Sequence, residues 1–282
     1  YIREHLQTLL EAHPGYEIYI TQGFICRDAE GDVSNLQRGG SDYTATLIGA
    51  ALGAREVQIW TDIDGMRCGD PRIVGDTRPV RHLYFEEASE LGYFGAKILH
   101  PTCIEPAQDA GVPVRLLNTM DPQAPGTLID GNLDPGTIKA VAAKDGITAL
   151  RITSSRALLA HNFIREVFQI FADHSTTMDM ITTSGSDISV AIDSTSALQA
   201  IVEDIEQYGA VSVDKDMSIV CVAGDMDWAN VGFQSRAMEA LHEIPVRMVS
   251  YGGSGSNISF LVKGEDKNRA LIALNDSLFG KQ

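Results

Sequence analysis

An internal repeat constrains the fold of the second half of this chain more than any other feature of its sequence. The segment Gly-Ser-Asp-Ile-Ser at residues 185–189 recurs, with Asn in place of Asp, at residues 255–259. At the same offset, Phe163 pairs with Phe233 and Met178 with Met248. Similar segments at a fixed offset indicate a duplicated structural unit. We therefore expect residues 146–282 to contain two copies of one small fold.

Each copy predicts strand, helix, strand, glycine-rich turn, strand and helix. The elements expected in the first copy lie at residues 147–152, 162–173, 176–182, 188–192 and 196–208. Those of the second lie at residues 218–223, 231–243, 246–251, 258–262 and 267–279. This order gives a small antiparallel sheet with two helices on one face, which is the ferredoxin-like arrangement. Paired units of this kind often form ligand sites or dimer interfaces where they meet, and a duplication without any ligand is the alternative.

The first half of the chain alternates between strand and helix patterns through residue 117, which indicates an α/β layer with a mainly parallel sheet. Strands are expected at residues 17–21, 57–60 and 112–117, and helices at residues 1–12, 43–52, 85–94 and 101–110. Residues 120–135 are rich in Asp, Pro and Gly, a composition typical of a linker. We expect the two halves of the chain to be joined there.

A run at residues 38–44, Arg-Gly-Gly-Ser-Asp-Tyr-Thr, is a candidate anion site. The two glycines allow a tight turn that exposes backbone N–H groups, and Ser41 or Asp42 can cap the helix expected to open at Tyr43. Free N–H groups and the helix dipole favour an anion, and Arg38 adds a cation. The run therefore favours a phosphate or a carboxylate as its ligand, with a plain turn and cap as the alternative.

Two further segments carry candidate ligand contacts. Thr61 and Asp62 end a strand that looks buried, and ligands of open α/β sheets bind at the carboxyl ends of strands. Lys97 lies between apolar residues near a helix end, where its ammonium group can act as a point charge on a phosphate. The alternatives are a surface loop for the first segment and a lysine that reaches water for the second.

Charge and cysteine content exclude several classes of function. The net charge of -16 argues against binding to nucleic acid or to anionic membrane surfaces. The four cysteines lie far apart without C-x-x-C spacing, so we do not expect a structural zinc site. The same spacing favours a reduced, cytoplasmic location. No apolar run approaches the roughly 18 residues of a membrane span, and no signal peptide is recognisable. The chain begins at Tyr1 without a methionine, which we interpret as the mark of a fragment.

Four segments, taken together, resemble the aspartate kinases of the amino acid kinase superfamily. They lie at residues 22–24, 38–45, 60–72 and 94–101. Their order and spacing match the carboxyl half of that family's kinase domain, and the repeat matches its tandem regulatory ACT modules. The resemblance covers essentially the whole chain. It implies an α/β fold class, in which the C-terminal part of an amino acid kinase α/β/α domain precedes two ferredoxin-like ACT modules of order βαββαβ.

The resemblance also implies a domain organisation. Residues 1–131 would form the carboxyl part of the catalytic domain, residues 132–213 a linker and the first ACT module, and residues 214–282 the second. In this family the first module tends to be nested in the second, so the strand at residues 138–142 is expected to join the second. The family's kinase domain begins with a Lys-Phe-Gly-Gly segment that this chain lacks. The activity of this chain alone therefore depends on whether that segment is dispensable or supplied otherwise.

The implied reaction is ATP plus L-aspartate giving ADP and 4-phospho-L-aspartate, the first step of lysine, threonine and methionine biosynthesis. The attacking side-chain carboxylate has an ordinary pKa of about 3.9, so it is already ionised and needs no general base. The difficulty is to bring two anions together, which requires cations, N–H donors and positioning. Magnesium would bridge the phosphates of ATP.

The resemblance assigns residues to this reaction. Arg38 and Ser41 would hold aspartate, and Asp42 would pair with its amino group or orient a lysine. The remaining residues would line the ATP site: Thr61, Asp62, Arg67, Arg72, Lys97 and Ile98. Of these, Arg67 lies near where some members of the family place an aromatic ring against the adenine.

Regulation by an amino acid at the ACT modules is implied as well. In this family the effector usually sits between two first modules of a homodimer, and lysine is the effector in the closest-looking subgroup. The matching positions are Phe163, Ile164, Met178, Asp179 and Ser184. Asp179 would pair with an ammonium group of the effector, and helix N–H groups would hold its carboxylate.

Two positions depart from the lysine-sensitive pattern. Ala157 stands where those members often have Met, and Gly185 stands where an acid is common. Threonine control and lost sensitivity are therefore alternatives to lysine. Two other functions stay open: a non-catalytic amino-acid sensor, and a different amino acid kinase such as a glutamate kinase, against which the tandem repeat argues.

Overall fold

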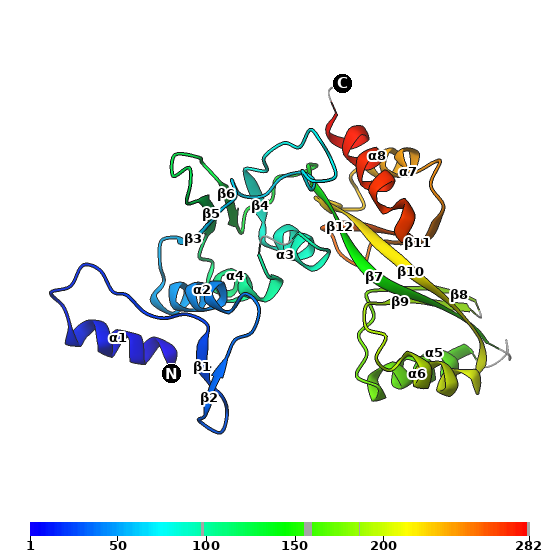
Figure 1. The fold of residues 1–282 in the computed structure, drawn as a ribbon, viewed down its shortest axis with the longest axis horizontal. Helices are drawn as coiled ribbons and strands as arrows, with labels where there is room; N and C mark the ends of the chain where they lie inside the picture. Colours follow the sequence, from blue (N-terminus) through cyan, green and yellow to red (C-terminus); the bar gives the residue numbers. More distant parts are fainter. Residues whose placement is uncertain (97–98, 155–159, 186, 281–282) are drawn as a thin grey trace. The chain divides into compact units, whose positions relative to one another are not determined.

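The computed structural model describes residues 1–96, 99–154, 160–185 and 187–280. The chain divides into two compact units, residues 1–140 with 223–225 and residues 141–222 with 226–282 (Figure 1). None of the helices in these described ranges is long and apolar enough to cross a membrane.

The first unit is built around a four-stranded mixed sheet of order β3-β5-β6-β4. The pairs β3–β5 and β4–β6 are parallel and the pair β5–β6 is antiparallel, so the sheet is mainly parallel as expected, with one antiparallel pair in its middle. The strands of this unit are β1 (Ile25–Arg27), β2 (Val33–Asn35), β3 (Val57–Thr61), β4 (His82–Tyr84), β5 (Val114–Asn118) and β6 (Thr127–Asp130). Its helices are α1 (Ile2–Ala12), α2 (Gly40–Leu52), α3 (Phe85–Tyr93), the 3-10 turn η1 (Pro101–Cys103) and α4 (Glu105–Ala110).

Strand β6 corrects the predicted linker. The turn formers of residues 120–135 hide a strand in which Thr127 and Ile129 are 0% exposed. This strand lies between β5 and β4, inside the sheet of the first unit. Asp, Pro and Gly on both sides of four strand residues produced a linker-like average composition.

Two other predicted elements differ from the structure. Residues 17–21 alternate like a strand but pair with no other strand in the described part of the chain, and Ile18 and Ile20 are 78% and 94% exposed. The helix predicted over residues 101–110 is divided into η1 and α4, because Pro106 has no N–H group to continue the first turn.

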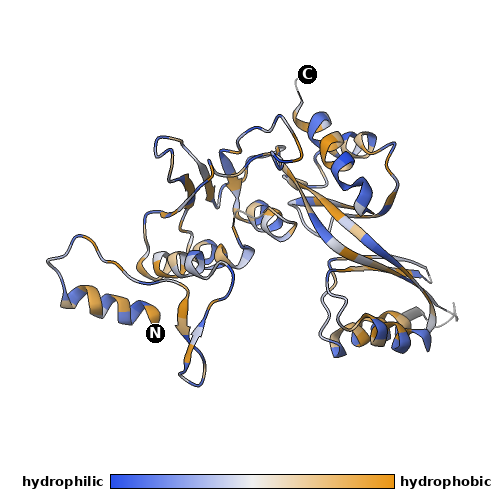
Figure 2. Cartoon of the chain, viewed as in Figure 1, coloured by the Kyte–Doolittle hydropathy of each residue, from blue (hydrophilic) through white to orange (hydrophobic). Residues whose placement is uncertain are grey.

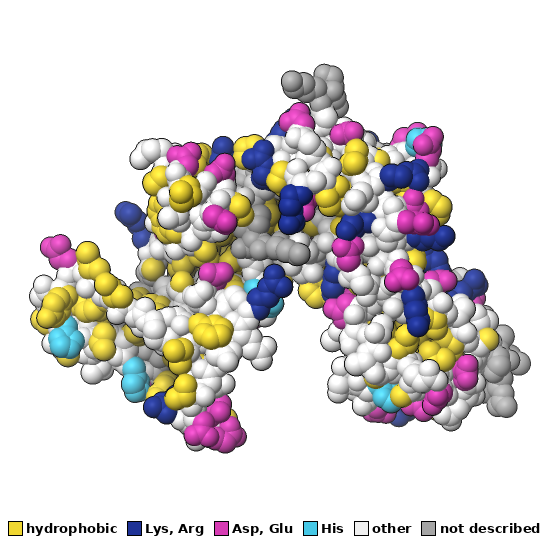
Figure 3. Space-filling view, viewed as in Figure 1, with side chains coloured by type: hydrophobic (Ala, Val, Ile, Leu, Met, Phe, Trp, Pro, Cys, Tyr) yellow, Lys and Arg dark blue, Asp and Glu magenta, His cyan; other side chains and the backbone are white. Residues whose placement is uncertain are grey.

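The amino-terminal segment exposes many apolar side chains. Figure 2 shows apolar and polar residues side by side on α1, in which no described residue is buried. Figure 3 shows hydrophobic side chains at the surface around α1 and the β1–β2 hairpin. Large exposed apolar surfaces on a folded unit commonly mark sites of contact with other protein surface.

The second unit contains one six-stranded sheet of order β11-β12-β10-β7-β9-β8. Its strands are β7 (Ile138–Ser154), β8 (Met180–Ser184), β9 (Asp187–Ile192), β10 (Gly209–Gly224), β11 (Val246–Tyr251) and β12 (Asn257–Lys263). Its α-helices are α5 (Ala160–Asp173), α6 (Leu198–Glu206), α7 (Phe233–Ala240) and α8 (Lys267–Phe279). Helices α5 and α6 lie together, as do α7 and α8 (Figure 1), so each repeat supplies one helix pair.

The two repeats share one sheet and do not form two separate ones. Strand β7 unites the strands predicted at residues 138–142 and 147–152, and β10 is a similarly long neighbour. Asp145 and Gly146 look like a turn in the sequence, but Gly146 takes a φ of 77° within the strand without ending it. A glycine can adopt that conformation inside a strand at little steric cost.

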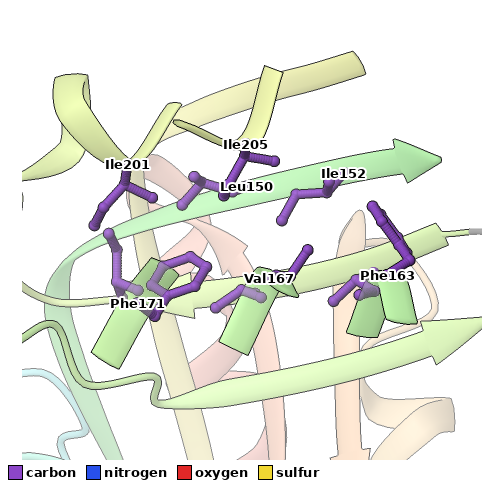
Figure 4. Packing of buried hydrophobic residues seen from close by; sticks show 10 residues of the cluster. Leu150, Ile152, Phe163, Val167, Phe171, Ile201 and Ile205 are labelled. Carbon is purple, nitrogen blue, oxygen red and sulfur yellow. The ribbon is translucent and has the colours of Figure 1, made fainter. Parts of the chain in front are cut away.

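The core of the first repeat explains why α5 is a helix. Phe163, Val167 and Phe171 recur every four residues and therefore lie on one helical face. They pack with Ile201 and Ile205 of α6 against the apolar side chains of β7 and β9 (Figure 4). Burial of each such side chain contributes about 1.5–3 kcal/mol.

A charged cluster joins β4 and β6 to the start of β7. The Nδ1 atom of His82 lies 2.7 Å from Asp134 Oδ2, and its Nε2 atom lies 2.9 Å from Asp130 Oδ1. Lys139 donates a hydrogen bond to the same oxygen of Asp134. Burial by itself would lower the pKa of His82, but its hydrogen bonds to Asp130 and Asp134 outweigh burial and raise the pKa. Lys139 and His82 lower the pKa of Asp134.

This cluster predicts a pH-dependent contribution to the stability of the first unit. Because the pKa of folded His82 is raised, the contribution is complete below the unfolded pKa of about 6.5 and is lost as the pH rises through the folded pKa. We expect His82→Asn to lower the free energy of unfolding by about 1–3 kcal/mol at pH 6 and by less at pH 9. Urea unfolding followed by Trp60 fluorescence, in a Trp228→Phe background, measures the first unit. An equal loss at both pH values would contradict the prediction.

Candidate functional site

The glycine turn before α2 packs closely against the side chains of His100 and Cys103. Gly39 is the N-cap residue with a φ of 75°, and a Cβ atom added there would lie 2.9 Å from Cys103 Sγ and 2.9 Å from His100 Cβ. The helix begins at Gly40, earlier than predicted, and no side chain of the described residues caps it. The expectation that Ser41 or Asp42 caps a helix opening at Tyr43 is therefore wrong. Both residues lie within the first helical turn, because the glycines let the helix start sooner.

The predicted substrate residues lie together at the start of α2, with Arg38 just before the N-cap residue and Ser41 and Asp42 in the first helical turn. Arg38 and Ser41 are exposed, and Asp42 is half-buried. Burial raises the pKa of the Asp42 carboxyl. Burial, with a smaller effect from the Asp42 charge, also raises the pKa of the Cys103 thiol to about 11, so this buried cysteine stays a neutral thiol beneath the turn. Among the described residues, neither the Arg38 guanidinium nor the Asp42 carboxylate has an ion-pair partner.

The end of β3 lies at the same edge of the first unit. A short connection joins the end of α2 to the start of β3, so the two elements run in opposite directions. The first turn of α2 and the carboxyl end of β3 therefore lie on one side. There Thr61 Oγ1 donates to Asp62 Oδ1 at 3.1 Å, and the Thr61 carbonyl accepts from the Thr119 N–H at 2.7 Å. Thr61 and Asp62 thus stand at the edge where ligands of such sheets bind.

The two predicted nucleotide-site arginines are engaged with their own loop. Arg72 is exposed and binds Asp70 with two guanidinium nitrogens, at 2.9 Å from Nε and 2.7 Å from Nη2. This hydrogen bonding raises the pKa of Arg72. Arg67 Nε donates to Thr77 Oγ1 at 2.6 Å, and its Nη2 donates to the Thr77 carbonyl. The structure thus ties Arg67 to the loop before β4. Lys97 and Ile98 lie outside the described residues.

The predicted effector positions divide between core and surface. Phe163 is 7% exposed within the core of the first repeat, and Met178 packs against that core. Ile164 is 41% exposed on the outer side of α5, and Ser184 is exposed at the end of β8. The side chain of Asp179 is 0% exposed and accepts a hydrogen bond from Lys144 Nζ at 2.8 Å.

Sequence reasoning missed the partners of Asp179. Lys144 Nζ also lies 2.9 Å from Asp193 Oδ2, so one ammonium group bridges two carboxylates. Lys144 is on β7, Asp179 precedes β8 and Asp193 follows β9. Only the strand order of the folded sheet brings these three residues together, and no local pattern in the sequence connects them.

Comparisons with known proteins agree with this architecture. Residues 1–118 match the model of the amino acid kinase family, and residues 220–278 match an ACT domain model. The chain is 35% identical to the lysine-sensitive aspartokinase 3 of Escherichia coli, over 97% of this chain and 63% of that protein. It is 36% identical to the chloroplastic aspartokinase 3 of Arabidopsis thaliana, over 88% of this chain and 46% of that protein.

Solved structures of aspartokinases are also similar to this chain. The structure of Escherichia coli aspartokinase III in complex with aspartate and ADP superposes with a TM-score of 0.86 at 34% identity, covering 98% of this chain and 63% of that one. The complex of the same enzyme with lysine and aspartate has a TM-score of 0.78 at 36% identity, with the same coverage. The chain thus spans less than two thirds of the length of these relatives.

Fold, site and similarity together define the class. An α/β unit with a glycine turn at the start of α2, followed by duplicated ferredoxin-like modules in one sheet, is an amino acid kinase fold with an ACT regulatory region. Within that class, the chain belongs to the aspartate kinase family.

Proposed function

We propose that this chain acts as an aspartate kinase, which transfers the γ-phosphoryl group of ATP to the side-chain carboxylate of L-aspartate. The observation that carries the proposal is the first turn of α2. There an exposed cation, Arg38, and a half-buried acid, Asp42, flank the N-terminus of a helix. Free aspartate carries two carboxylates and one ammonium group, which this arrangement of charges complements.

The roles of these residues follow from their chemistry. Arg38 and Ser41 hold a carboxylate of aspartate, and Asp42 pairs with its ammonium group. The attacking carboxylate is ionised at neutral pH, since its ordinary pKa is about 3.9, and no proton has to be removed from it. The protein therefore has to align two anions and to place positive charge and N–H donors around them.

The nucleotide would lie against the carboxyl end of β3, where Thr61 and Asp62 line the site. Arg72 can turn from Asp70 to a phosphate because an exposed ion pair is only weakly held. Arg67 would stabilise the loop before β4 and would not contact the phosphates, since its guanidinium group already donates hydrogen bonds to Thr77. Lys97 and Ile98 remain part of the proposed ATP site. Magnesium, when bound to the phosphates, would supply neutralising charge.

We also propose that the ACT modules make the enzyme a homodimer that is inhibited by an amino acid, with lysine favoured over threonine. The lysine complex of the Escherichia coli relative supports this choice. Effector binding would shift an equilibrium between active and inactive arrangements of the dimer. We further propose domain boundaries after residues 131 and 213, with residues 138–142 belonging to the second module. We also propose a cytoplasmic location for the protein.

The test is formation of aspartyl hydroxamate from aspartate, ATP, magnesium and hydroxylamine. We expect product with aspartate and almost none with glutamate, whose longer side chain misplaces the attacking carboxylate. The assay is run on this chain and on the same chain extended to the length of its relatives. Absence of product from both would overturn the kinase proposal, and lysine binding without product would favour the alternative of a non-catalytic sensor.

A further inference from the structure

The ion-pair cluster of Lys144, Asp179 and Asp193 has more acid than base. One ammonium group lies 2.8 Å from the first carboxylate and 2.9 Å from the second. Two carboxylates thus share one ammonium group. The attraction between a carboxylate and an ammonium group is strong where the site is partly shielded from water.

The two carboxylates differ in their access to solvent. The side chain of Asp179 is 0% exposed, that of Lys144 is 18% exposed and that of Asp193 is 39% exposed. Lys144 is thus the more exposed partner of a buried acid. Because two ammonium groups repel each other, an ammonium group arriving from outside competes with Lys144 for the Asp179 carboxylate.

The fold supplies a place to which Lys144 can retreat. Asp179 and Asp193 lie at the same end of neighbouring strands, since Met180 pairs with Ala191 and the Asp179 N–H donates to the Ala191 carbonyl at 2.8 Å. Lys144 already contacts both acids. When an effector ammonium group pairs with Asp179, Lys144 can release that acid and keep its contact with Asp193, so neither carboxylate is left without a cation.

The second repeat lacks this arrangement. At the repeat offset, Lys144 corresponds to Asp214, Asp179 to Val249 and Asp193 to Lys263. Asp214 pairs instead with Arg247 of β11, at 3.0 Å from Nε to Oδ2. Lys263 pairs with Glu265 at 3.5 Å. The three positions of the second repeat therefore hold one acid, one apolar residue and one base, and they do not form a cluster of two acids around one lysine.

From these contacts we propose that Lys144 is an internal competitor for the effector at Asp179. Without effector, the Lys144 ammonium group pairs with Asp179 as well as with Asp193. When an effector ammonium group pairs with Asp179, Lys144 keeps only its contact with Asp193. Lys144 thereby sets the affinity of the site for a cationic amino acid. This inference rests on the proposed effector site and adds to it the residue that tunes its affinity.

Calorimetric titration of lysine into the chain and its variants tests the exchange. Lys144→Met removes the competitor and should tighten lysine binding about tenfold or more, because close charge pairs of this kind are coupled strongly. Lys144→Arg keeps the competing cation and should change the affinity by less than about threefold. Lys263→Met removes an exposed lysine of β12 and should have no effect. Thermal unfolding of each variant checks that it is folded.

Two further variants keep the test decisive. Asp193→Asn removes the acid to which Lys144 retreats and should weaken lysine binding, opposite to Lys144→Met. Lys144→Met combined with Asp179→Asn should lose the gain, because the gain needs the buried acid. Unchanged or weaker binding by Lys144→Met, while the unsubstituted chain binds lysine, would overturn the competitor alone. If neither the unsubstituted chain nor Lys144→Met binds lysine, the proposed effector site is overturned as well. Neither result would contradict the proposed kinase activity, which the hydroxamate assay tests separately.

Discussion

Replacing Arg38 with alanine should lower kcat/KM for aspartate by about 30-fold to several thousand-fold, which corresponds to the 2–5 kcal/mol typical of a lost charge-assisted contact. The loss should appear mainly as a higher KM for aspartate, with a smaller change in the KM for ATP. Arg38 is exposed and has no ion-pair partner among the described residues, so its removal leaves no partner uncompensated. The hydroxamate assay measures both constants.

Two variants serve as controls for Arg38. Arg38→Lys keeps the charge but not the planar fork that binds a carboxylate with two nitrogens, so it should fall between Arg38→Ala and the unsubstituted protein. Arg55→Ala removes an exposed arginine beyond the other end of α2 and should leave kcat/KM unchanged. A loss below threefold for Arg38→Ala would remove Arg38 from the substrate site.

Gly126→Ala should be the most destabilising single-methyl addition in the first unit. A Cβ atom at this position would lie 1.9 Å from the Leu116 carbonyl oxygen of β5, and the glycine has a φ of 64°. The antiparallel pairing of β5 with β6 would have to separate to make room. We expect a loss of about 4 kcal/mol or more in the free energy of unfolding, because left-handed strain and a backbone clash add together.

Gly111→Ala is the matched control for Gly126→Ala. Gly111 has nearly the same φ, 65°, but a Cβ atom there would meet no described atom within 4 Å. Its cost should be the backbone strain alone, about 1–2 kcal/mol. Urea unfolding monitored through Trp60, with Trp228 replaced by phenylalanine, compares the two. Similar losses for both glycines would show that the close approach of residue 126 to β5 is not a structural constraint.

Local patterns in the sequence predicted many elements well. The helices α1 and α8, the strands β3 and β11 and the order of elements in both repeats follow from periodicity, caps and glycines. Errors arose where a strand was short or where turn-forming residues lay inside a strand. Strand β6 has four residues between Gly126 and Gly131, and β7 continues through Asp145 and Gly146.

The candidate site was predictable only in part, for a physical reason. Arg38, Ser41 and Asp42 are neighbours in the sequence, so one motif sufficed to place them on one turn. The Lys144 cluster combines residues from three parts of the chain. Contacts of that kind depend on strand order and register, which a single sequence does not specify.

The most direct test of the account is the hydroxamate assay in a titration with lysine, on this chain extended to the length of its relatives and with threonine run in parallel. The account predicts aspartate-dependent product that falls as lysine is added and changes little with threonine. It also predicts that Asp179→Asn keeps the activity and loses the inhibition. Product that lysine leaves unchanged would contradict regulation at Asp179, and no product at all would contradict the assignment of aspartate kinase activity.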